Sequence, residues 1–361
     1  MSKGRTRHMF AGGNTSEGFF SYFDHILPQE RAERIYILKG GPGTGKSTFM
    51  KNIAEALCNE GYETEFIHCS SDPSSLDAVV FPEKGIAIMD GTAPHVVDPK
   101  NPGAVDEIIN LGRFWNNEGL TVNREGICAV NAEIGELFRR AYRYLQAGYS
   151  LYRDNEVIYG MAMDRGKANA VISGIIKEIF AGIDIAEKEG KQRHMFASAI
   201  TPDGLVNYLP SLLTTKKVVV IEGKPGTGTE KLLEKVRNCA TERGLYTESY
   251  YCALNPHKLE HLVIPELDIS LTTSNESHHA DVKYTEKIDL NKLLDDSVIR
   301  RYKEEIEFNG NYFKMLLNRA VETIKKAREK HDELEKFYIP NMNFDEIKKC
   351  QDELLDRIAK N

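Results

Sequence analysis

The sequence predicts an α/β protein made of two tandem α/β/α units, each with an appended helical hairpin. Three observations lead to this prediction. A glycine-rich loop lies between an apolar run and a helical pattern, the same arrangement returns 183 residues later, and a helical pattern with little β signal follows each copy. The chain has 361 residues, enough for two ordinary domains. We therefore expect residues 1–190 and residues 191–361 to form one unit each.

The glycine-rich loop of the first unit, residues 40–47, reads GGPGTGKS and fits the pattern G-x-x-x-x-G-K-[ST]. The apolar run at residues 34–39 predicts a buried strand before it, and apolar residues at helical spacing follow it. Backbone N–H groups of such a loop, together with a helix N-terminus, attract phosphate oxygens. The sequence therefore predicts a nucleotide site. Its expected binding residues are Gly41, Pro42, Gly43, Thr44, Gly45, Lys46, Ser47 and Thr48.

Four side chains have expected roles that follow from their positions in the loop or at the ends of predicted strands. Lys46 is expected to reach the terminal phosphates and the Ser47 hydroxyl to bind Mg²⁺. Asp90 ends the apolar run GIAIM and is expected to be the second magnesium ligand. Asp72 ends another predicted strand, at the sheet edge where ligands of open α/β sheets bind. We assign Lys46, Asp90 and Asp72 to catalysis, although Asp72 before Pro73 is equally typical of a turn.

The second unit lacks the groups that nucleotide chemistry requires. At the positions of Lys46, Ser47 and Asp90 it has Thr229, Glu230 and Thr273. A carboxylate in place of the serine repels the anions of a nucleotide. Because three positions that serve one task change together, we expect the first unit to bind nucleotide and the second to be non-catalytic.

The second loop gains one cation, Lys224, at the position of Gly41. At this single position it resembles the signature-lysine family of dimeric P-loop ATPases, in which the lysine crosses an interface to the partner's nucleotide. We hold as a hypothesis that the two units face each other as an intrachain pseudo-dimer and that Lys224 completes the first site. The simpler alternative is a solvated lysine in a decayed loop.

Outside the loops, residues 7–11 predict a strand, and residues 15–20 predict the start of a helix capped by Thr15 or Ser16. The turns of the two helical hairpins are predicted near residues 159–161 and 338–341. Tyrosines and arginines alternate on the first hairpin between residues 138 and 153. Such a series can bind nucleic acid, but it is more typical of a helix that packs its aromatic rings inward and solvates its charges.

Bulk composition narrows the class of protein. Acidic residues number 54 and basic residues 47, and the net charge is −7 with both signs mixed along the chain. General affinity for nucleic acid is therefore not predicted. The six cysteines form no C-x-x-C pair, which favours reduced thiols. No apolar run is long enough to cross a bilayer, so we expect a cytoplasmic protein without a membrane partner.

The loop and Asp90 resemble the P-loop NTPase superfamily, so each unit is expected to be P-loop NTPase-like. Over its whole length the chain resembles a family of tandem P-loop proteins described mainly as uncharacterised bacterial ATPases. That resemblance rests on residues 8–13 (HMFAGG), 38–47 (LKGGPGTGKS) and 90–99 (DGTAPHVVDP). It implies ATP binding, with ATP and Mg²⁺ as cofactors, and no particular substrate.

The leading interpretation is a Mg²⁺-dependent ATPase that hydrolyses nucleotide in the first unit. Lys46, Mg²⁺ and the backbone of the loop would stabilise charge on the transferred phosphoryl group. An arginine from a helical segment or a partner would complete the site. Arg113 is a candidate, with packing on Trp115 as its alternative role.

Two other functions stay open at this point. One is a small-molecule or nucleotide kinase with the helical hairpin as a lid. The other is a nucleotide-gated switch whose hairpins bind a protein partner. Association of whole chains into a homo-oligomer is also compatible with the sequence.

Overall fold

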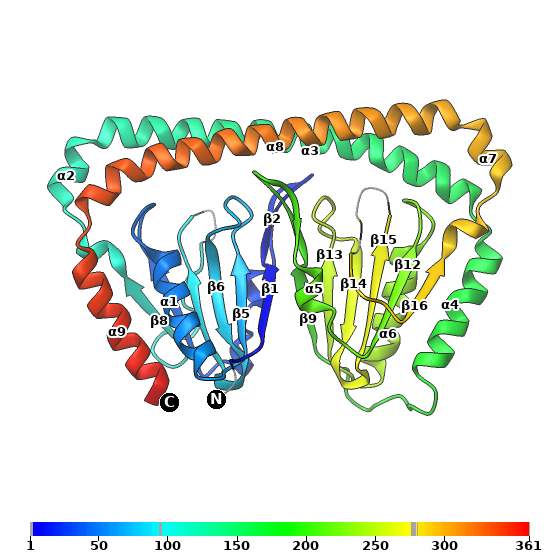
Figure 1. The fold of residues 1–361 in the computed structure, drawn as a ribbon, viewed down its shortest axis with the longest axis horizontal. Coiled ribbons are helices and arrows are strands. Elements are labelled where there is room, and N and C mark those ends of the chain that lie inside the picture. The colour runs from blue at the N-terminus through cyan, green and yellow to red at the C-terminus, as the bar shows by residue number, and fades with distance from the viewer. Residues whose placement is uncertain (1–2, 94–95, 276–278, 280, 361) are drawn as a thin grey trace.

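A computed structural model describes residues 3–93, 96–275, 279 and 281–360. Within these residues, twelve strands form one mixed sheet, and helices cover parts of both its faces and one edge (Figure 1). The predicted α/β class is therefore confirmed. The strand order is β16-β12-β15-β14-β13-β9-β1-β5-β6-β7-β4-β8.

We call β1, β4–β8 and helix α1 the first half, and β9, β12–β16 and helix α6 the second half. The strands of the first half are β1 (Thr6–Phe10), β4 (Arg34–Lys39), β5 (Thr64–His68), β6 (Leu76–Phe81), β7 (Ile86–Asp90) and β8 (Asp106–Asn110). Those of the second half are β9 (Gln192–Phe196), β12 (Lys217–Glu222), β13 (Thr247–Tyr251), β14 (Leu259–Ile264), β15 (Ile269–Ser274) and β16 (Glu286–Asp289). The second half repeats the first in mirror order about the contact between β9 and β1.

The sheet is mixed because one strand of each half runs against its neighbours. In the first half, β4 is parallel to both β7 and β8, whereas β6 is antiparallel to β5 and β7. The carboxyl ends of β4, β5 and β7 therefore meet at one edge. The predicted nucleotide residues lie at or after these three ends.

The two halves meet at a short β contact and a buried charge cluster. Phe10 of β1 pairs with Phe196 of β9 in antiparallel fashion. Behind it, Glu65 accepts hydrogen bonds from Arg7 at 2.8 Å and from Arg193 at 2.7 Å. Glu248 accepts from Arg7 at 3.0 Å. All four charged side chains are at most 10% exposed. Because a buried charge loses its hydration, each of them needs its ion-pair partners to offset that cost.

The helix predicted at residues 15–20 is wrong. Strands β2 (Gly12–Thr15) and β3 (Gly18–Ser21) form a hairpin there, and β10 (Ser198–Thr201) and β11 (Gly204–Asn207) form its counterpart. The Thr15 hydroxyl accepts the N–H of Glu17 and donates to the carbonyl of Gly18, which has a φ of 100°. The predicted capping residue thus closes a tight turn, because the glycine permits the positive φ.

Helices α1 (Lys46–Asn59) and α6 (Thr229–Glu242) follow the two glycine-rich loops, and α5 (Leu209–Leu212) follows β11. The remaining helices come in two matching series. The first is α2 (Asn117–Val122), α3 (Arg124–Ala162) and α4 (Arg165–Ile179), and the second is α7 (Asp296–Arg301), α8 (Lys303–Tyr338) and α9 (Phe344–Lys360). The helix breaks fall at residues 163–164 and 339–343, close to the predicted turns.

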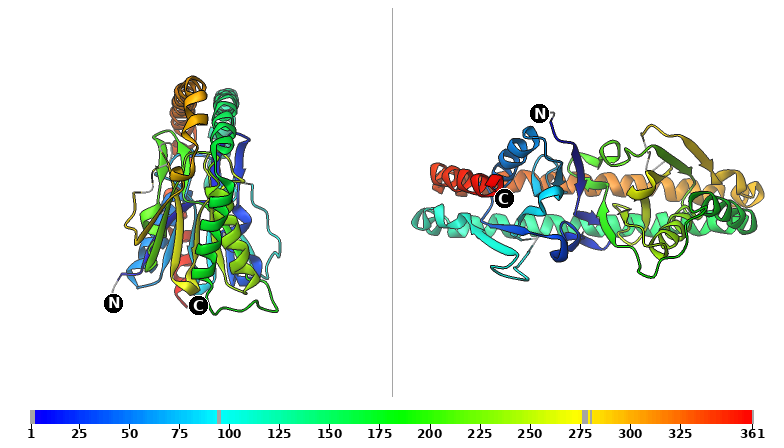
Figure 2. Two further views of the ribbon diagram at one scale, coloured as in Figure 1. Left: turned by 90° about the vertical axis from the view of Figure 1, so that its right-hand side faces the viewer. Right: turned by 90° about the horizontal axis from the view of Figure 1, so that it is seen from below.

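The predicted pairing of these helices is wrong, because neither series folds back as a hairpin. Instead α3 and α8 lie side by side and antiparallel, and they run across one end of the strands along the whole sheet (Figures 1 and 2). Helix α4 then packs on the second half through Ile172 and Phe180, and α9 packs on the first half through Ile347 and Leu354. Each series therefore begins at one half and ends on the other.

The aromatic side chains of α3 pack inward, as the sequence favours. Tyr142 donates a hydrogen bond to Asn14, and Tyr152 is buried in a cluster with Phe313 of α8. The neighbouring Arg139 and Arg143 are exposed.

In the described part of the chain, no helix is both long and apolar enough to cross a membrane.

Candidate nucleotide-binding site

Residues 40–47 connect the carboxyl end of β4 to the start of α1, in the strand-loop-helix setting that the sequence predicts. Two loop glycines have positive φ angles, 64° at Gly43 and 82° at Gly45. A side chain at either position would be strained. Gly45 is also the residue before the first turn of α1, so the N–H groups of that turn open toward the loop.

Lys46 and Asp90 converge on this loop. The Lys46 ammonium donates to the carbonyls of Gly40 at 2.8 Å and Gly41 at 2.9 Å, and its Nζ lies 3.6 Å from Oδ2 of Asp90. Asp90 is close because β7 lies directly beside β4. The other Asp90 oxygen accepts the N–H of Thr92 at 2.8 Å. The structure therefore places the predicted phosphate cation and the predicted magnesium acid together.

Three hydroxyl residues of the loop differ in their surroundings. Thr44 is buried and donates to the carbonyl of Gly41 at 2.9 Å, which closes the loop on itself. The Ser47 hydroxyl accepts the N–H of Leu76 at 3.1 Å. Thr48 is exposed on the first turn of α1. The contact of Ser47 with Leu76 fixes the segment after β5 against the start of α1.

Asp72 lies in that segment, and its carboxylate already has hydrogen-bond and ion-pair partners. Its carboxylate accepts hydrogen bonds from the hydroxyls of Ser74 at 2.7 Å and Ser75 at 2.6 Å, and lies 3.0 Å from Nη2 of Arg328 on α8. Burial raises the pKa of Asp72, but the two serine hydrogen bonds and the Arg328 charge outweigh burial and keep this pKa below its usual value. A carboxylate in this state is a weak base.

The end of α8 covers the loop. A Cβ atom placed on Gly41 would lie 2.6 Å from the Tyr338 ring, and one on Gly43 would lie 3.0 Å from Ile339. Sequence reasoning missed this cover, because it expected α8 to fold back within its own unit. The only usable signal was the predicted turn at residues 338–341, which gave the position of the joint but not its location on the first half.

The second glycine-rich loop is covered more tightly. A Cβ atom on Gly226 would lie 2.0 Å from the carbonyl oxygen of Glu156 on α3. The Glu156 carboxylate also binds the buried Lys258 ammonium at 2.6 Å. Burial raises the pKa of Glu230, which replaces the serine. Helix backbone and an internal ion pair thus occupy the space above this loop.

The Lys224 hypothesis is wrong. Strands β4 and β12, which precede the two loops, are separated by eight other strands. With strands spaced by about 4.8 Å, the loops are roughly 40 Å apart, far beyond the reach of a lysine side chain. The two halves are joined edge to edge, and the loops do not face each other.

Arg113 packs on the ring of Phe114, with its guanidinium carbon 4.6 Å from the ring centre. The sequence offered Trp115 as the packing partner. The Trp115 ring instead lies 6.4 Å from the ring of Tyr338, centre to centre. Whether Arg113 contacts a bound nucleotide stays a prediction.

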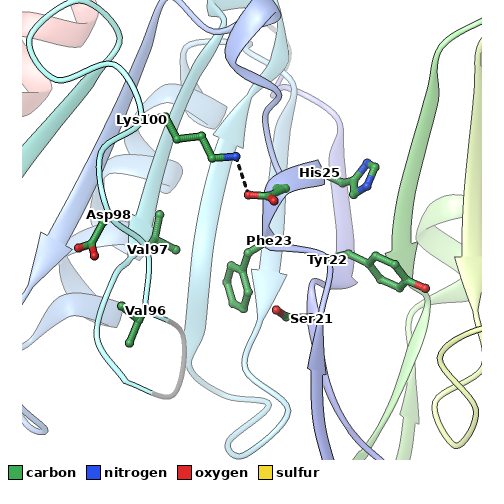
Figure 3. A pocket seen from close by; sticks show the side chains of 9 residues that line it. Ser21, Tyr22, Phe23, His25, Val96, Val97, Asp98 and Lys100 are labelled. Carbon is green, nitrogen blue, oxygen red and sulfur yellow. Dashed lines mark hydrogen bonds and ion pairs between the residues drawn. The ribbon is translucent and has the colours of Figure 1, made fainter. Parts of the chain in front are cut away.

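A cavity of 430 Å³ lies beside the segment that follows Asp90 (Figure 3). It is lined by residues 21–25, 96–98 and Lys100, and an ion pair of 2.8 Å joins Lys100 to Asp24 in its wall. No residue of the loop at 40–48 lines it, so it is separate from the site. Residues 94 and 95 of the motif at 90–99 lie outside the described residues.

Among the residues that the structure describes, no group of three or more His, Cys, Asp or Glu side chains is placed to hold a metal ion. Any metal at the loop therefore needs oxygen ligands from a bound phosphate or water besides those of the protein.

No family model, curated protein or solved structure matches this chain.

Proposed function

We propose that this protein is a Mg²⁺-dependent ATPase with two P-loop NTPase-like units, residues 1–190 and 191–361, which exchange helices α4 and α9, and that the first unit hydrolyses ATP. The observation that carries the proposal is the position of Lys46, which donates to the loop carbonyls of Gly40 and Gly41 and lies 3.6 Å from Asp90. An ammonium that binds neutral carbonyls gains a stronger partner in an anionic phosphate. The positive end of α1 favours the same anion.

The residues present fit a magnesium ion bound together with a triphosphate. Ser47 supplies a hydroxyl and Asp90 a carboxylate, both oxygen donors of the kind that Mg²⁺ prefers. Mg²⁺ usually takes only one or two protein ligands and completes its shell with water and phosphate oxygens. When bound, the ion would neutralise charge that develops on the terminal phosphate. Lys46 and the loop N–H groups would orient the phosphates and stabilise the same charge.

The second half is proposed to be non-catalytic for a reason beyond its missing residues. The Glu156 carbonyl, on the backbone of α3, lies so close to Gly226 that even a methyl group does not fit there. The buried Lys258 ammonium near this loop is already paired with Glu156. A nucleotide would have to displace both.

A nucleotide-gated switch is the second candidate function, and the cover on the first loop favours it. Tyr338 and Ile339 touch the loop, and they end a helix that runs along α3 to the other half. A ligand that moves these two residues would move α8 against α3. A protein partner bound to the long helices would then respond to nucleotide.

Phosphate release from ATP tests the proposal. The parent protein should release phosphate with Mg²⁺ and without an acceptor, and Lys46→Ala should lower turnover by about 100-fold or more. Thr229→Ala, at the matching position of the second loop, should leave turnover unchanged. Equal turnover by the parent and Lys46→Ala would contradict the proposal.

The same assay separates the other functions. ADP formation that depends on an added acceptor indicates a kinase. Tight binding of Mg²⁺-ATP without turnover indicates a switch. Binding should be measured on the full chain, because helices from each series complete the opposite half.

A further inference from the structure

One ion pair joins the long helix α8 to the edge of the nucleotide site. Nη2 of Arg328 lies 3.0 Å from Oδ1 of Asp72, in the segment that follows β5. Asp203 lies farther from the same guanidinium, at 3.9 Å. Arg328 therefore comes from the series that follows the second half and contacts the first half.

This pair lies near the groups proposed to bind phosphate and magnesium. Asp72 binds the Ser75 hydroxyl, and the next residue, Leu76, donates its N–H to Ser47. Seven residues after Arg328, Glu335 lies against Gly43 of the loop. Residues seven apart share a face of a helix and are about 10 Å apart along it. The face of α8 that carries Arg328 thus runs along the site from the Ser47 side to Gly43.

The second half contains an uncharged version of the same contact. The offset of 183 that relates the two loops carries Asp72 onto Asn255, and the starts of α3 and α8 at residues 124 and 303 carry Arg328 onto Tyr149. The Asn255 amide donates to the Tyr149 hydroxyl at 2.7 Å. Both halves therefore use this contact to attach a long helix to the segment after a strand, and neither charge is needed for that purpose.

The charges are present only in the half that also has a lysine, a serine and an aspartate for nucleotide. This joint occurrence favours a role for the Arg328 charge in the same task as these three residues. An arginine side chain at this position is one-third exposed and has several rotatable bonds. A guanidinium binds a phosphate through parallel N–H groups, and a phosphate carries more negative charge than one carboxylate.

We infer that Arg328 binds the terminal phosphoryl group of a nucleotide while this group is being transferred in the first-half site, and that Asp72 holds Arg328 in place before that step. This inference rests on the proposed function. Transfer of Arg328 to the phosphate frees the Asp72 carboxylate, which then lies beside the Ser47 end of the site. The long helix α8 thereby becomes part of the site that it covers.

The test uses two variants of the full chain. In the first, Arg328→Ala removes the cation. In the second, Arg328→Tyr and Asp72→Asn together copy the Tyr149–Asn255 contact, so the helix stays attached without the charges. Both should bind Mg²⁺-ATP within about threefold of the parent and lose turnover by about 100-fold or more. Both should also fail to retain Mg²⁺-ADP with aluminium fluoride, a mimic of the transferred phosphoryl group.

Arg319→Ala is the matched control, because Arg319 lies on the same helix and pairs with Glu322 at 3.0 Å, away from the site. It should retain the aluminium fluoride complex. Parental turnover by the double variant would overturn this inference and leave the ATPase proposal intact. Absence of Lys46-dependent ATP binding by the parent would overturn the ATPase proposal itself.

Discussion

Arg7 of β1 and Glu248 of β13 form a buried ion pair that joins the two halves of the sheet. Arg193 and Glu65, at the corresponding positions, form a second pair beside it. Glu65 also binds Arg7, so the three contacts form one network across the junction. Because the network is buried, the stability of the junction depends on each charge keeping its partner.

Glu248→Gln is expected to destabilise the protein by about 3–5 kcal/mol, because the change leaves Arg7 buried with a weaker partner. Urea unfolding followed by circular dichroism measures the loss. Glu286→Gln is the control, since the Glu286 side chain is 40% exposed and pairs with Lys217 at 3.1 Å. The control should change stability by less than about 1 kcal/mol. Equal effects of the two changes would contradict a structural role for the network.

Stability should fall in acid through the same residues. Burial raises the pKa of Glu248, but the charge and hydrogen bonds of Arg7 outweigh burial and lower this pKa to about 2. The pKa of Glu65 is lowered for the same kind of reason, chiefly by Arg193 against the effect of burial. The unfolded chain binds protons on these glutamates near their ordinary pKa of about 4.3. Their contribution is therefore complete above that pH and is lost as the pH falls toward 2.

Thermal midpoints measured between pH 5.5 and pH 2.5 test this dependence. The parent should lose stability more steeply than Glu248→Gln, which has one titrating group fewer in the network. Parallel curves for the two proteins would show that other carboxylates account for the acid sensitivity.

Two glycine substitutions should have opposite effects. Gly226→Ala places a methyl group 2.0 Å from the carbonyl oxygen of Glu156 at a φ of 85°, and should destabilise the protein by at least about 2 kcal/mol. Gly310→Ala lies inside α8 with no neighbouring atom within 4 Å, and should stabilise it by about 0.5–1 kcal/mol. Denaturant midpoints check both. If Gly226→Ala left stability unchanged, α3 would not be in contact with the second loop.

The single tryptophan of the chain should report nucleotide binding. Trp115 lies 6.4 Å from Tyr338, the ring that covers Gly41. Displacement of Tyr338 changes the surroundings of the indole, so Mg²⁺-ATP should shift its emission in the parent. Lys46→Ala should show no shift at the same ATP concentrations, and Trp115→Phe gives the background. An equal shift with Lys46→Ala would place the binding event elsewhere.

The parts of the site that the sequence predicted depend on neighbours in the chain. The glycines of the loop, the apolar run before it and the helical pattern after it are consecutive, so local conformational preferences determine their structure. Asp90 could be found for a similar reason, because an acid at the end of a buried strand lies at the sheet edge. Its distance of 3.6 Å from Lys46 required only that β7 lie beside β4.

The helix pairing could not be predicted, because an apolar stripe does not specify its partner. The stripes of α3 and α8 bury the same residues whether each helix meets its own successor or the other long helix. The deciding contacts are distant in sequence: Met163 pairs with Leu294, and Trp115 pairs with Met342, in isolated β-bridges. These bridges attach the end of each long helix to the start of the other series.

The prediction of a helix start at Thr15 was wrong for a different reason. Threonine before a glutamate is typical of a helix start, but its hydroxyl serves a two-residue hairpin turn equally well. Arg328 had no signal at all in the sequence. Only the folded chain brings position 328 to position 72.

The exchange of helices determines when the first half is completed during synthesis. Gln351 of α9 accepts a hydrogen bond from Asn52 of α1, 299 residues earlier in the chain. A nascent chain that leaves the ribosome has the glycine-rich loop early, yet the helices that cover it emerge only after the whole second half. During translation the loop is therefore exposed before its cover exists, and it is covered only when α8 and α9 arrive.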